Sequence, residues 1–254
     1  MQSAQQPEPS RAGPRVAVVA AMEEELYSLR QRLSDVERVA LSVGSAVRGS
    51  LEFEEVLLMA TGEGAVAAEK GLSALLSDRN IGVLLIVGVA GAISPDLAVG
   101  DLVAVDSVRD EHGEIPLPDS SLLRRALTSA NVVRGGVVSV DQIVVEALAK
   151  RALWQSVGGG PYQVVDLESA TYARLAAQRG IPYFILRAVS DTAGESLPLD
   201  FNEFRGSDGS IDRGKVARHL IFHPHLIGPL KSLRARLREC AVSMADVVEG
   251  ILKP

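Results

Sequence analysis

The strongest constraint on the fold comes from two apolar segments that each end in a carboxylate. Residues 164–168 have the sequence VVDLE, and residues 185–191 have the sequence ILRAVSD. Residues 169–179, which lie between them, have helical composition, and a glycine and a proline that follow end the helix. Such a strand–helix–strand unit is typical of an open α/β sheet, which binds ligands at the carboxyl ends of its strands. We therefore expect Glu168 and Asp191 to lie together at one ligand site.

Composition favours a single α/β domain and argues against several classes of function. The 254 residues are 47% hydrophobic but only 4% aromatic, which suits a core of Val, Leu, Ala and Ile. A net charge of −6 argues against nucleic-acid binding. Cys240 is the only cysteine, so the chain can form no internal disulfide and no cysteine-based metal site. We interpret His219, His223 and His225 as surface residues of a helical tail, and we predict no metal and no cofactor.

The two ends of the chain differ in composition from its centre. Residues 1–14 are rich in Gln, Pro, Ser and Gly, and we expect them to form a disordered leader. Residues 15–254 form one predicted domain, with an extended helical tail over 205–254. The pattern of a secretion signal is missing, and no apolar run approaches the roughly 20 residues of a membrane-spanning helix. The expected location is therefore the cytoplasm.

The predicted tail is basic along one side of its helices. A solvated face is the simpler interpretation of this charge, and a membrane or partner surface is the alternative. The residues concerned are Arg218, Lys231, Arg234, Arg236 and Arg238.

Periodicity and turn residues predict the other elements. We expect strands over residues 16–21, 36–43, 45–53, 55–60, 83–87, 101–108 and 132–138. We expect a loop over 109–118 and helices that start at residue 22 and span 65–76, 120–130, 143–153, 213–222 and 226–252. Small-residue turns at 61–64 and 88–92 follow two of these strands, and glycines there would let backbone N–H groups approach a ligand.

A run of three glutamates follows the first predicted strand. The helix dipole favours acidic residues in the first turn of a helix, which is the structural interpretation of Glu23, Glu24 and Glu25. Only one of the three needs to face a ligand site.

Five segments occur in an order that is known from one family. They are residues 21–25, 61–64, 87–91, 166–168 and 187–191, with the sequences AMEEE, TGEG, VGVAG, DLE and RAVSD. On these segments the chain resembles the nucleoside phosphorylase/nucleosidase superfamily, and most closely the bacterial 5′-methylthioadenosine/S-adenosylhomocysteine nucleosidases. The resemblance implies a three-layer α/β/α sandwich around a mixed, partly barrel-like central sheet. It also implies assembly as a dimer or a higher homo-oligomer.

The resemblance further implies a role for each of three acids. Asp191 resembles the family acid that protonates N7 of the purine as the base departs. Glu168 resembles the carboxylate that holds the ribose hydroxyls, and Glu25 resembles the base that orients the attacking water. Other implied residues surround these groups: Met22 and Leu167 beside the sugar, the backbone of residues 142–144 at the edge of the base, and Arg187 and Ser190 in support of the acid loop.

The chemistry explains why two carboxyls are needed in different states. Cleavage of an N-glycosidic bond leaves positive charge on the sugar and negative charge on the base, which calls for an acid, a carboxylate and a positioned nucleophile. We expect Asp191 to stay uncharged in a dry pocket until the purine takes its proton. Glu168 should instead stay ionised, because it accepts hydrogen bonds from two hydroxyls. From the residues alone, Asp191 is equally well explained as a helix N-cap.

The nucleophile is either water or phosphate. Phosphorylases bind phosphate through an arginine, a serine and glycine N–H groups. Here Val89 stands where a serine is common, no arginine occurs in residues 84–87, and the first strand ends in two alanines rather than in a glycine. We therefore predict hydrolysis of a 5′-substituted adenosine such as methylthioadenosine or S-adenosylhomocysteine, with a purine nucleoside phosphorylase as the alternative. A nucleoside-binding protein without catalysis is the third hypothesis.

Departures from the family pattern bear on the 5′ substituent. Val89, Leu167, Ile143 and the neighbouring Val144 make the predicted pocket aliphatic, and Gly194 stands where an acid is common. An adenine nucleoside remains the expected small-molecule partner. A related branch of the family acts on adenosylated hopanoid lipids, which the basic amphipathic tail would suit, and this substrate stays open as an alternative.

Overall fold

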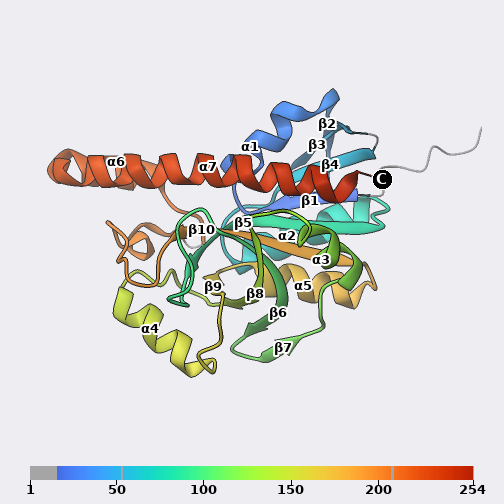
Figure 1. The fold of residues 1–254 in the computed structure, drawn as a ribbon. Helices are drawn as coiled ribbons and strands as arrows, with labels where there is room; N and C mark the ends of the chain where they lie inside the picture. The colour runs from blue at the N-terminus through green and yellow to red at the C-terminus, as the bar shows by residue number, and fades with distance from the viewer. Residues whose placement is uncertain (1–15, 53, 207–208, 254) are drawn as a thin grey trace, which may run out of the picture.

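The computed structural model describes residues 16–52, 54–206 and 209–253. Helices cover both faces of one sheet, which gives the three layers that the sequence predicts (Figure 1). The predicted leader over residues 1–14 lies outside the described residues. None of the helices in the described part combines the length and the apolar character that a membrane crossing requires.

The strands and helices follow the predicted order, with differences at their ends. The strands are β1 (Val16–Ala20), β2 (Ser34–Ala40), β3 (Ser45–Leu51), β4 (Glu54–Ala60), β5 (Val83–Ala92), β6 (Leu102–Asp110), β7 (Gly113–Ile115), β8 (Val132–Ser139), β9 (Gln163–Asp166) and β10 (Tyr183–Asp191). The α-helices are α1 (Glu23–Arg32), α2 (Ala65–Asp78), α3 (Ser120–Ala126), α4 (Ala147–Ser156), α5 (Ser169–Gln178), α6 (Arg213–Phe222) and α7 (Ile227–Leu252). Short 3₁₀ helices span Phe201–Phe204 and Pro224–Leu226.

Part of the sheet closes into a barrel, and the rest extends from it. β5 pairs with β10 and with β9, β10 pairs with β6, and β8 joins β6 to β9, which closes the ring. β1, β4, β3 and β2 continue the sheet from β5 in that order. The sheet is mixed, because β5 runs parallel to β10 but antiparallel to β9. The predicted mixed, partly barrel-like sheet is thus confirmed.

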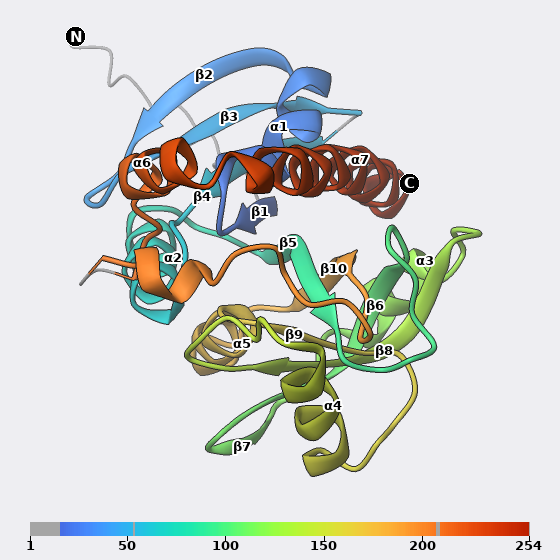
Figure 2. The ribbon, with the colours of Figure 1, turned by 90° about the vertical axis from the view of Figure 1, so that its left-hand side faces the viewer.

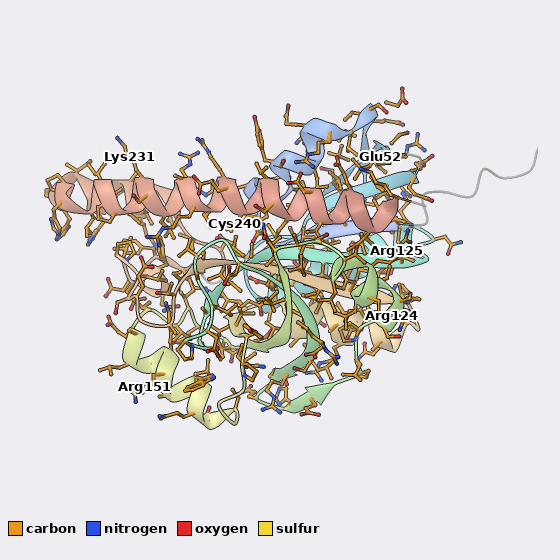
Figure 3. The ribbon with its side chains drawn as sticks, in the orientation of Figure 1. Glu52, Arg124, Arg125, Arg151, Lys231 and Cys240 are labelled. Atoms are coloured by element: carbon orange, nitrogen blue, oxygen red, sulfur yellow. The ribbon has the colours of Figure 1, made fainter. Side chains whose placement is uncertain are left out.

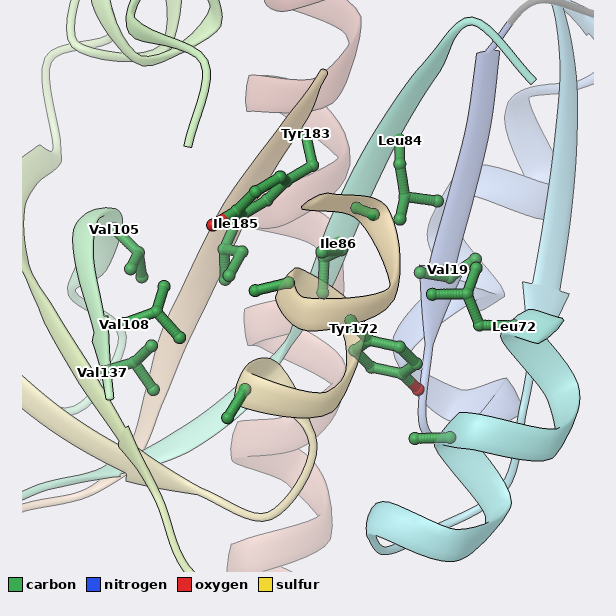
Figure 4. Packing of buried hydrophobic residues seen from close by; sticks show 14 of the residues in the cluster. Val19, Leu72, Leu84, Ile86, Val105, Val108, Val137, Tyr172, Tyr183 and Ile185 are labelled. Carbon is green, nitrogen blue, oxygen red and sulfur yellow. The ribbon is translucent and has the colours of Figure 1, made fainter. Parts of the chain in front are cut away.

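Alternating side chains of the central strands fill two separate cores. In β1, Val18 faces one core and Val19 faces the other. Helices α1, α3 and α7 cover the core around Val18, and α2 and α5 cover the core around Val19 (Figure 2). Figure 4 shows the second core, in which Leu72 of α2 and Tyr172 of α5 lie on the same side of the sheet as Val19. Because both faces of the strand are buried, β1 is apolar at every position.

β5 is longer than predicted, because residues 88–92 continue the strand and do not form a turn. The small residues there make room for side chains of β10, which runs parallel beside β5. A Cβ on Gly88 would lie 2.0 Å from Nη1 of Arg187, and a Cβ on Gly91 would lie 3.0 Å from Oδ2 of Asp191. The glycines therefore permit close packing against two predicted site residues.

Among the boundaries that differ from the prediction, three change the description of an element or of a site residue. α4 begins at Ala147 and not at residue 143, which leaves Ile143 and Val144 in a loop. The predicted loop over 109–118 contains β7, which pairs with the end of β6. β9 ends at Asp166, so Glu168 is the N-cap residue of α5 and not the last residue of the strand.

The predicted tail is partly core and partly projecting. The C-terminal half of α7 buries Cys240, Met244 and Val248 in the core that α1 also covers. α6 and the first turns of α7 project beyond the body of the molecule, with Lys231 on the projecting part and Cys240 over the sheet (Figure 1, Figure 3). Arg236 forms an ion pair with Glu195 at 2.8 Å, so the basic side of the tail is not solvated along its whole length.

Candidate active site

A cavity of about 360 Å³ lies where the carboxyl ends of β1, β9 and β10 meet. This volume is in the range of small-molecule sites. The three predicted acids, Glu25, Glu168 and Asp191, all line the cavity. It is also lined by the predicted residues Met22, Val89, Ile143, Val144, Leu167 and Ser190. Arg187 does not line it, because its side chain is buried behind the wall.

Glu25 is the glutamate of the acidic run that lines this cavity. Its Oε2 accepts a hydrogen bond from the backbone N–H of Met22, and its Oε1 accepts one from the backbone N–H of Val89, both at 2.8 Å. Met22 is the N-cap residue of α1, so Glu25 both completes the helix cap and faces the cavity. Burial raises the pKa of Glu25, and the charge of Arg187 opposes this shift.

Glu168 is held by the turn at residues 61–64. Its Oε1 accepts a hydrogen bond from the backbone N–H of Gly64 at 2.6 Å, and the φ of Gly64 is +86°, which favours glycine. Burial and then the charge of Asp166 raise the pKa of Glu168 to about 8. The raised pKa favours the protonated carboxyl near neutral pH, whereas the sequence predicts an ionised group. The physical reason is the burial of Glu168, to which the charge of Asp166, a second buried acid that lines the same cavity, adds.

Arg187 supplies positive charge behind these acids. Its guanidinium lies 2.7 Å from Oδ2 of Asp166 and donates to Oγ of Ser169 at 2.9 and 3.0 Å. Asp166 also accepts hydrogen bonds from Oγ of Ser139 at 2.6 Å and from the N–H of Ser169 at 3.2 Å. Arg187 thus forms an ion pair with Asp166, the acid that precedes Leu167 and Glu168, and its predicted support of the loop at Asp191 stays a prediction.

Asp191 ends β10 and is 4% exposed. Its Oδ1 accepts a hydrogen bond from Oγ of Ser190 at 2.6 Å, as expected of a residue that supports the acid. Its Oδ2 accepts a hydrogen bond from Nζ of Lys150, which the sequence does not predict. A loop and no helix follows Asp191, so the N-cap alternative is wrong.

The loop before α4 supplies Ile143 and Val144 to the lining of the cavity. The N–H of Ile143 donates to Oδ1 of Asn202, and Nδ2 of Asn202 donates to the C=O of Ile143, both at 2.9 Å. The N–H and C=O of Val144 form no hydrogen bond with any residue that the structure describes. Val144 also lines the cavity, so these unbonded backbone groups belong to a lining residue.

A sequence model of the phosphorylase superfamily matches residues 15–221. The chain belongs to this superfamily. The match confirms the family that the five sequence segments predict.

Solved structures share this fold over most of their length. The chain is similar to a Campylobacter jejuni 5′-methylthioadenosine/S-adenosylhomocysteine nucleosidase, with 22% identity, a TM-score of 0.71, and coverage of 94% of this chain and 98% of that one. For a Streptococcus pneumoniae nucleosidase in complex with 8-aminoadenine, the identity is 21%, the TM-score 0.73 and the coverage 94% and 99%. For a Helicobacter pylori futalosine hydrolase, the identity is 20%, the TM-score 0.73 and the coverage 96% and 99%.

In this member of the phosphorylase superfamily, one part of the cavity lining is apolar. It is formed by Leu197, Phe201, Ile211, Val216, Leu233 and Leu237, most of which belong to the predicted tail. Two arginines also line the cavity. Arg205 donates to the C=O of Asp141 at 2.6 Å, and Arg213 donates to Glu24 at 2.8 Å. Both guanidinium groups thus donate hydrogen bonds to other residues of the same chain.

Three polar residues of the site are missing from the sequence prediction. Asp166 carries a signal, because it is the first acid of the DLE segment and follows an apolar run. Lys150 and Asn202 carry none, since each lies in ordinary helical or loop sequence. Only the folded chain brings Lys150 to Asp191 and Asn202 to Ile143.

Proposed function

We propose that this protein hydrolyses the N-glycosidic bond of a 5′-substituted adenosine. The observation that carries the proposal is the convergence of three buried carboxyls, Glu25, Glu168 and Asp191, on one cavity of about 360 Å³. Cleavage of the bond needs an acid for the base, a carboxyl at the sugar and a positioned nucleophile. The three residues supply one function each.

Each carboxyl acts on a different part of the substrate. Asp191 gives its proton to N7 of the purine as the electron pair of the glycosidic bond moves to the base. Glu168 binds the ribose hydroxyls, whose donors favour its ionised form. Glu25 takes a proton from the water that attacks the sugar. The N–H groups of Met22 and Val89 hold the Glu25 carboxylate in one orientation, so the water is positioned before the bond breaks.

The charges around Glu25 favour water over phosphate as the nucleophile. A phosphate dianion needs arginine and N–H donors. The N–H groups of Met22 and Val89 already bond to Glu25, and Arg187 is paired with Asp166. A dianion at this place would also meet the Glu25 carboxylate, and like charges repel strongly at short distance.

Val144 and the apolar wall support the choice of substrate. A free N–H near a free C=O matches adenine, whose N1 accepts and whose 6-amino group donates. The wall around Leu197, Phe201 and Val216 favours an apolar 5′ substituent, such as a methylthio group, over the charged amino-acid arm of S-adenosylhomocysteine. For the same reason, this lining favours a larger apolar 5′ substituent, such as that of an adenosylated hopanoid.

A panel of adenosines with different 5′ substituents tests the proposal. Free adenine is measured with and without phosphate for adenosine, 5′-methylthioadenosine, S-adenosylhomocysteine and analogues with longer apolar groups. We expect release without phosphate, with the highest kcat/KM for an apolar substituent. Release that requires phosphate would identify a phosphorylase, and binding without release would identify a nucleoside-binding protein. Either result contradicts the proposal.

A further inference from the structure

Lys150 is a buried lysine to which the proposed reaction assigns no role. Its side chain has an exposure of 0%, and lysines are almost never fully buried without a partner. α4, which carries Lys150, buries no other residue. Moving an ammonium group out of water costs several kcal/mol, so the surroundings of Lys150 must compensate for its charge.

Oxygen atoms surround Nζ of Lys150. It donates to Oδ2 of Asp191, to the C=O of Thr192 at 2.9 Å and to the C=O of Glu195 at 2.6 Å. An ammonium group has three N–H donors, and each of them has an acceptor here. These bonds fix both the carboxyl of Asp191 and the segment that follows it.

Both oxygens of the Asp191 carboxyl accept hydrogen bonds. Oδ2 accepts from Lys150, and Oδ1 accepts from Oγ of Ser190 at 2.6 Å. Donors at both oxygens stabilise the carboxylate that Asp191 becomes when it gives its proton to a base. The donors are therefore in place for the charge that develops during bond cleavage.

A second ion pair holds the same segment from the side of α7. Arg236 donates to the two carboxylate oxygens of Glu195 at 2.8 and 2.9 Å and to the C=O of Ser190 at 3.4 Å. Arg236 and Glu195 neutralise each other. The positive charge at the carboxyl of Asp191 thus comes from Lys150.

We propose that Lys150 is a positioning residue for Asp191, which fixes the carboxyl and stabilises the carboxylate that remains when the proton moves to the leaving purine. This inference rests on the proposed function. In the step, the electron pair of the C–N bond moves to the base, N7 takes the proton of Asp191, and Lys150 keeps all of its own protons.

Charge-removing variants at position 150 test this role. Lys150→Gln keeps two N–H donors for the carbonyls of Thr192 and Glu195 but has no charge. Lys150→Met fills a similar volume and gives the same test if Lys150→Gln does not fold. Lys150→Arg keeps a cation. Arg236→Gln is the matched control, because it loosens the same segment without removing the cation bonded to the carboxyl of Asp191.

The expected result separates charge stabilisation from a structural role. In Lys150→Gln, kcat should fall by about 10²-fold while KM changes by less than about threefold, because the loss concerns the transition state. The alkaline limb of kcat/KM should move up by about one pH unit or more, because a neighbouring cation favours the ionised carboxyl. Lys150→Arg and Arg236→Gln should both leave the limb in its wild-type position.

Two results would overturn the role of Lys150 without touching the proposed function. The first is an alkaline limb of kcat/KM that stays at the wild-type pH in Lys150→Gln. The second is an alkaline limb that moves as far in Arg236→Gln as in Lys150→Gln. A wild-type enzyme that releases no base from any nucleoside overturns the role of Lys150 and the proposed function together.

Discussion

Replacing Glu168 by glutamine should remove a large pH dependence from the stability of this protein. Glu168 is 8% exposed and shares the cavity with Asp166. Burial and then the charge of Asp166 raise the pKa of Glu168 to about 8, from an ordinary value of 4.5. The folded chain therefore binds this proton more tightly than the unfolded chain. The stability that results is complete below pH 4.5 and is lost as the pH rises through 8.

The size of the effect follows from the two pKa values. The difference between about 8 and 4.5, at about 1.4 kcal/mol per pH unit, corresponds to about 5 kcal/mol. The N–H of Gly64 and the charge of Arg187 favour the ionised carboxyl, but burial and the charge of Asp166 outweigh them and raise the pKa of Glu168 to about 8. Across this range, the wild type should lose up to about 5 kcal/mol of unfolding free energy relative to Glu168→Gln.

Urea denaturation between about pH 5 and pH 9 measures this difference as the free energy of unfolding of each protein. The difference in unfolding free energy between wild type and Glu168→Gln should change steadily up to about pH 8 and then level off. Asp166→Asn is the matched control: removing the neighbouring charge lowers the pKa of Glu168, so the change should be smaller and should level off at a lower pH. Parallel curves for wild type and Glu168→Gln would refute the reasoning.

Three further predictions concern the same cavity. Glu25→Gln should slow adenine release about 10²-fold or more with little effect on nucleoside binding, whereas Glu23→Gln, whose side chain is 70% exposed, should match the wild type; full activity of Glu25→Gln would exclude Glu25 as the base. Gly88→Ala should lower the unfolding free energy by about 1–3 kcal/mol, because its Cβ would lie 2.0 Å from a buried guanidinium, whereas Gly250→Ala meets no atom outside its own helix within 4 Å and should not; equal stability of the two variants would contradict this. Nucleoside binding near pH 7 should release a proton from Glu168, which calorimetry in buffers of different ionisation enthalpy counts, and binding without proton release would show that the carboxyl is already ionised.

The α/β class of the fold was predictable because the central strands are largely apolar and buried, whereas the three layers were implied by the family resemblance. β1 and β10 are buried at every position, and such runs predict strands covered by helices. The end of β5 was not predictable, because small residues are typical of turns when they are considered alone. What keeps this segment extended is β10, much later in the chain, whose Arg187 and Asp191 occupy the space beside Gly88 and Gly91.

The positions of the acids were predictable, but their surroundings were not. Glu168 and Asp191 follow apolar runs, and the carboxyl ends of strands meet at one edge of a sheet. The charge state of a carboxyl depends on neighbours that the sequence does not place. The structure sets Lys150 against Asp191 and Asp166 beside Glu168, and burial together with the charge of Asp166 raises the pKa of Glu168.

The origin of the new oxygen atom in the sugar product tests the central claim most directly. Wild type and Asp191→Asn are given 5′-methylthioadenosine in ¹⁸O-labelled water without phosphate, and the sugar is reduced with borohydride at once to prevent exchange. We predict that the wild-type product carries ¹⁸O at C1, and that Asp191→Asn releases adenine slower by about 10²-fold or more. No cleavage by the wild type without phosphate, or undiminished cleavage by Asp191→Asn, would contradict the account.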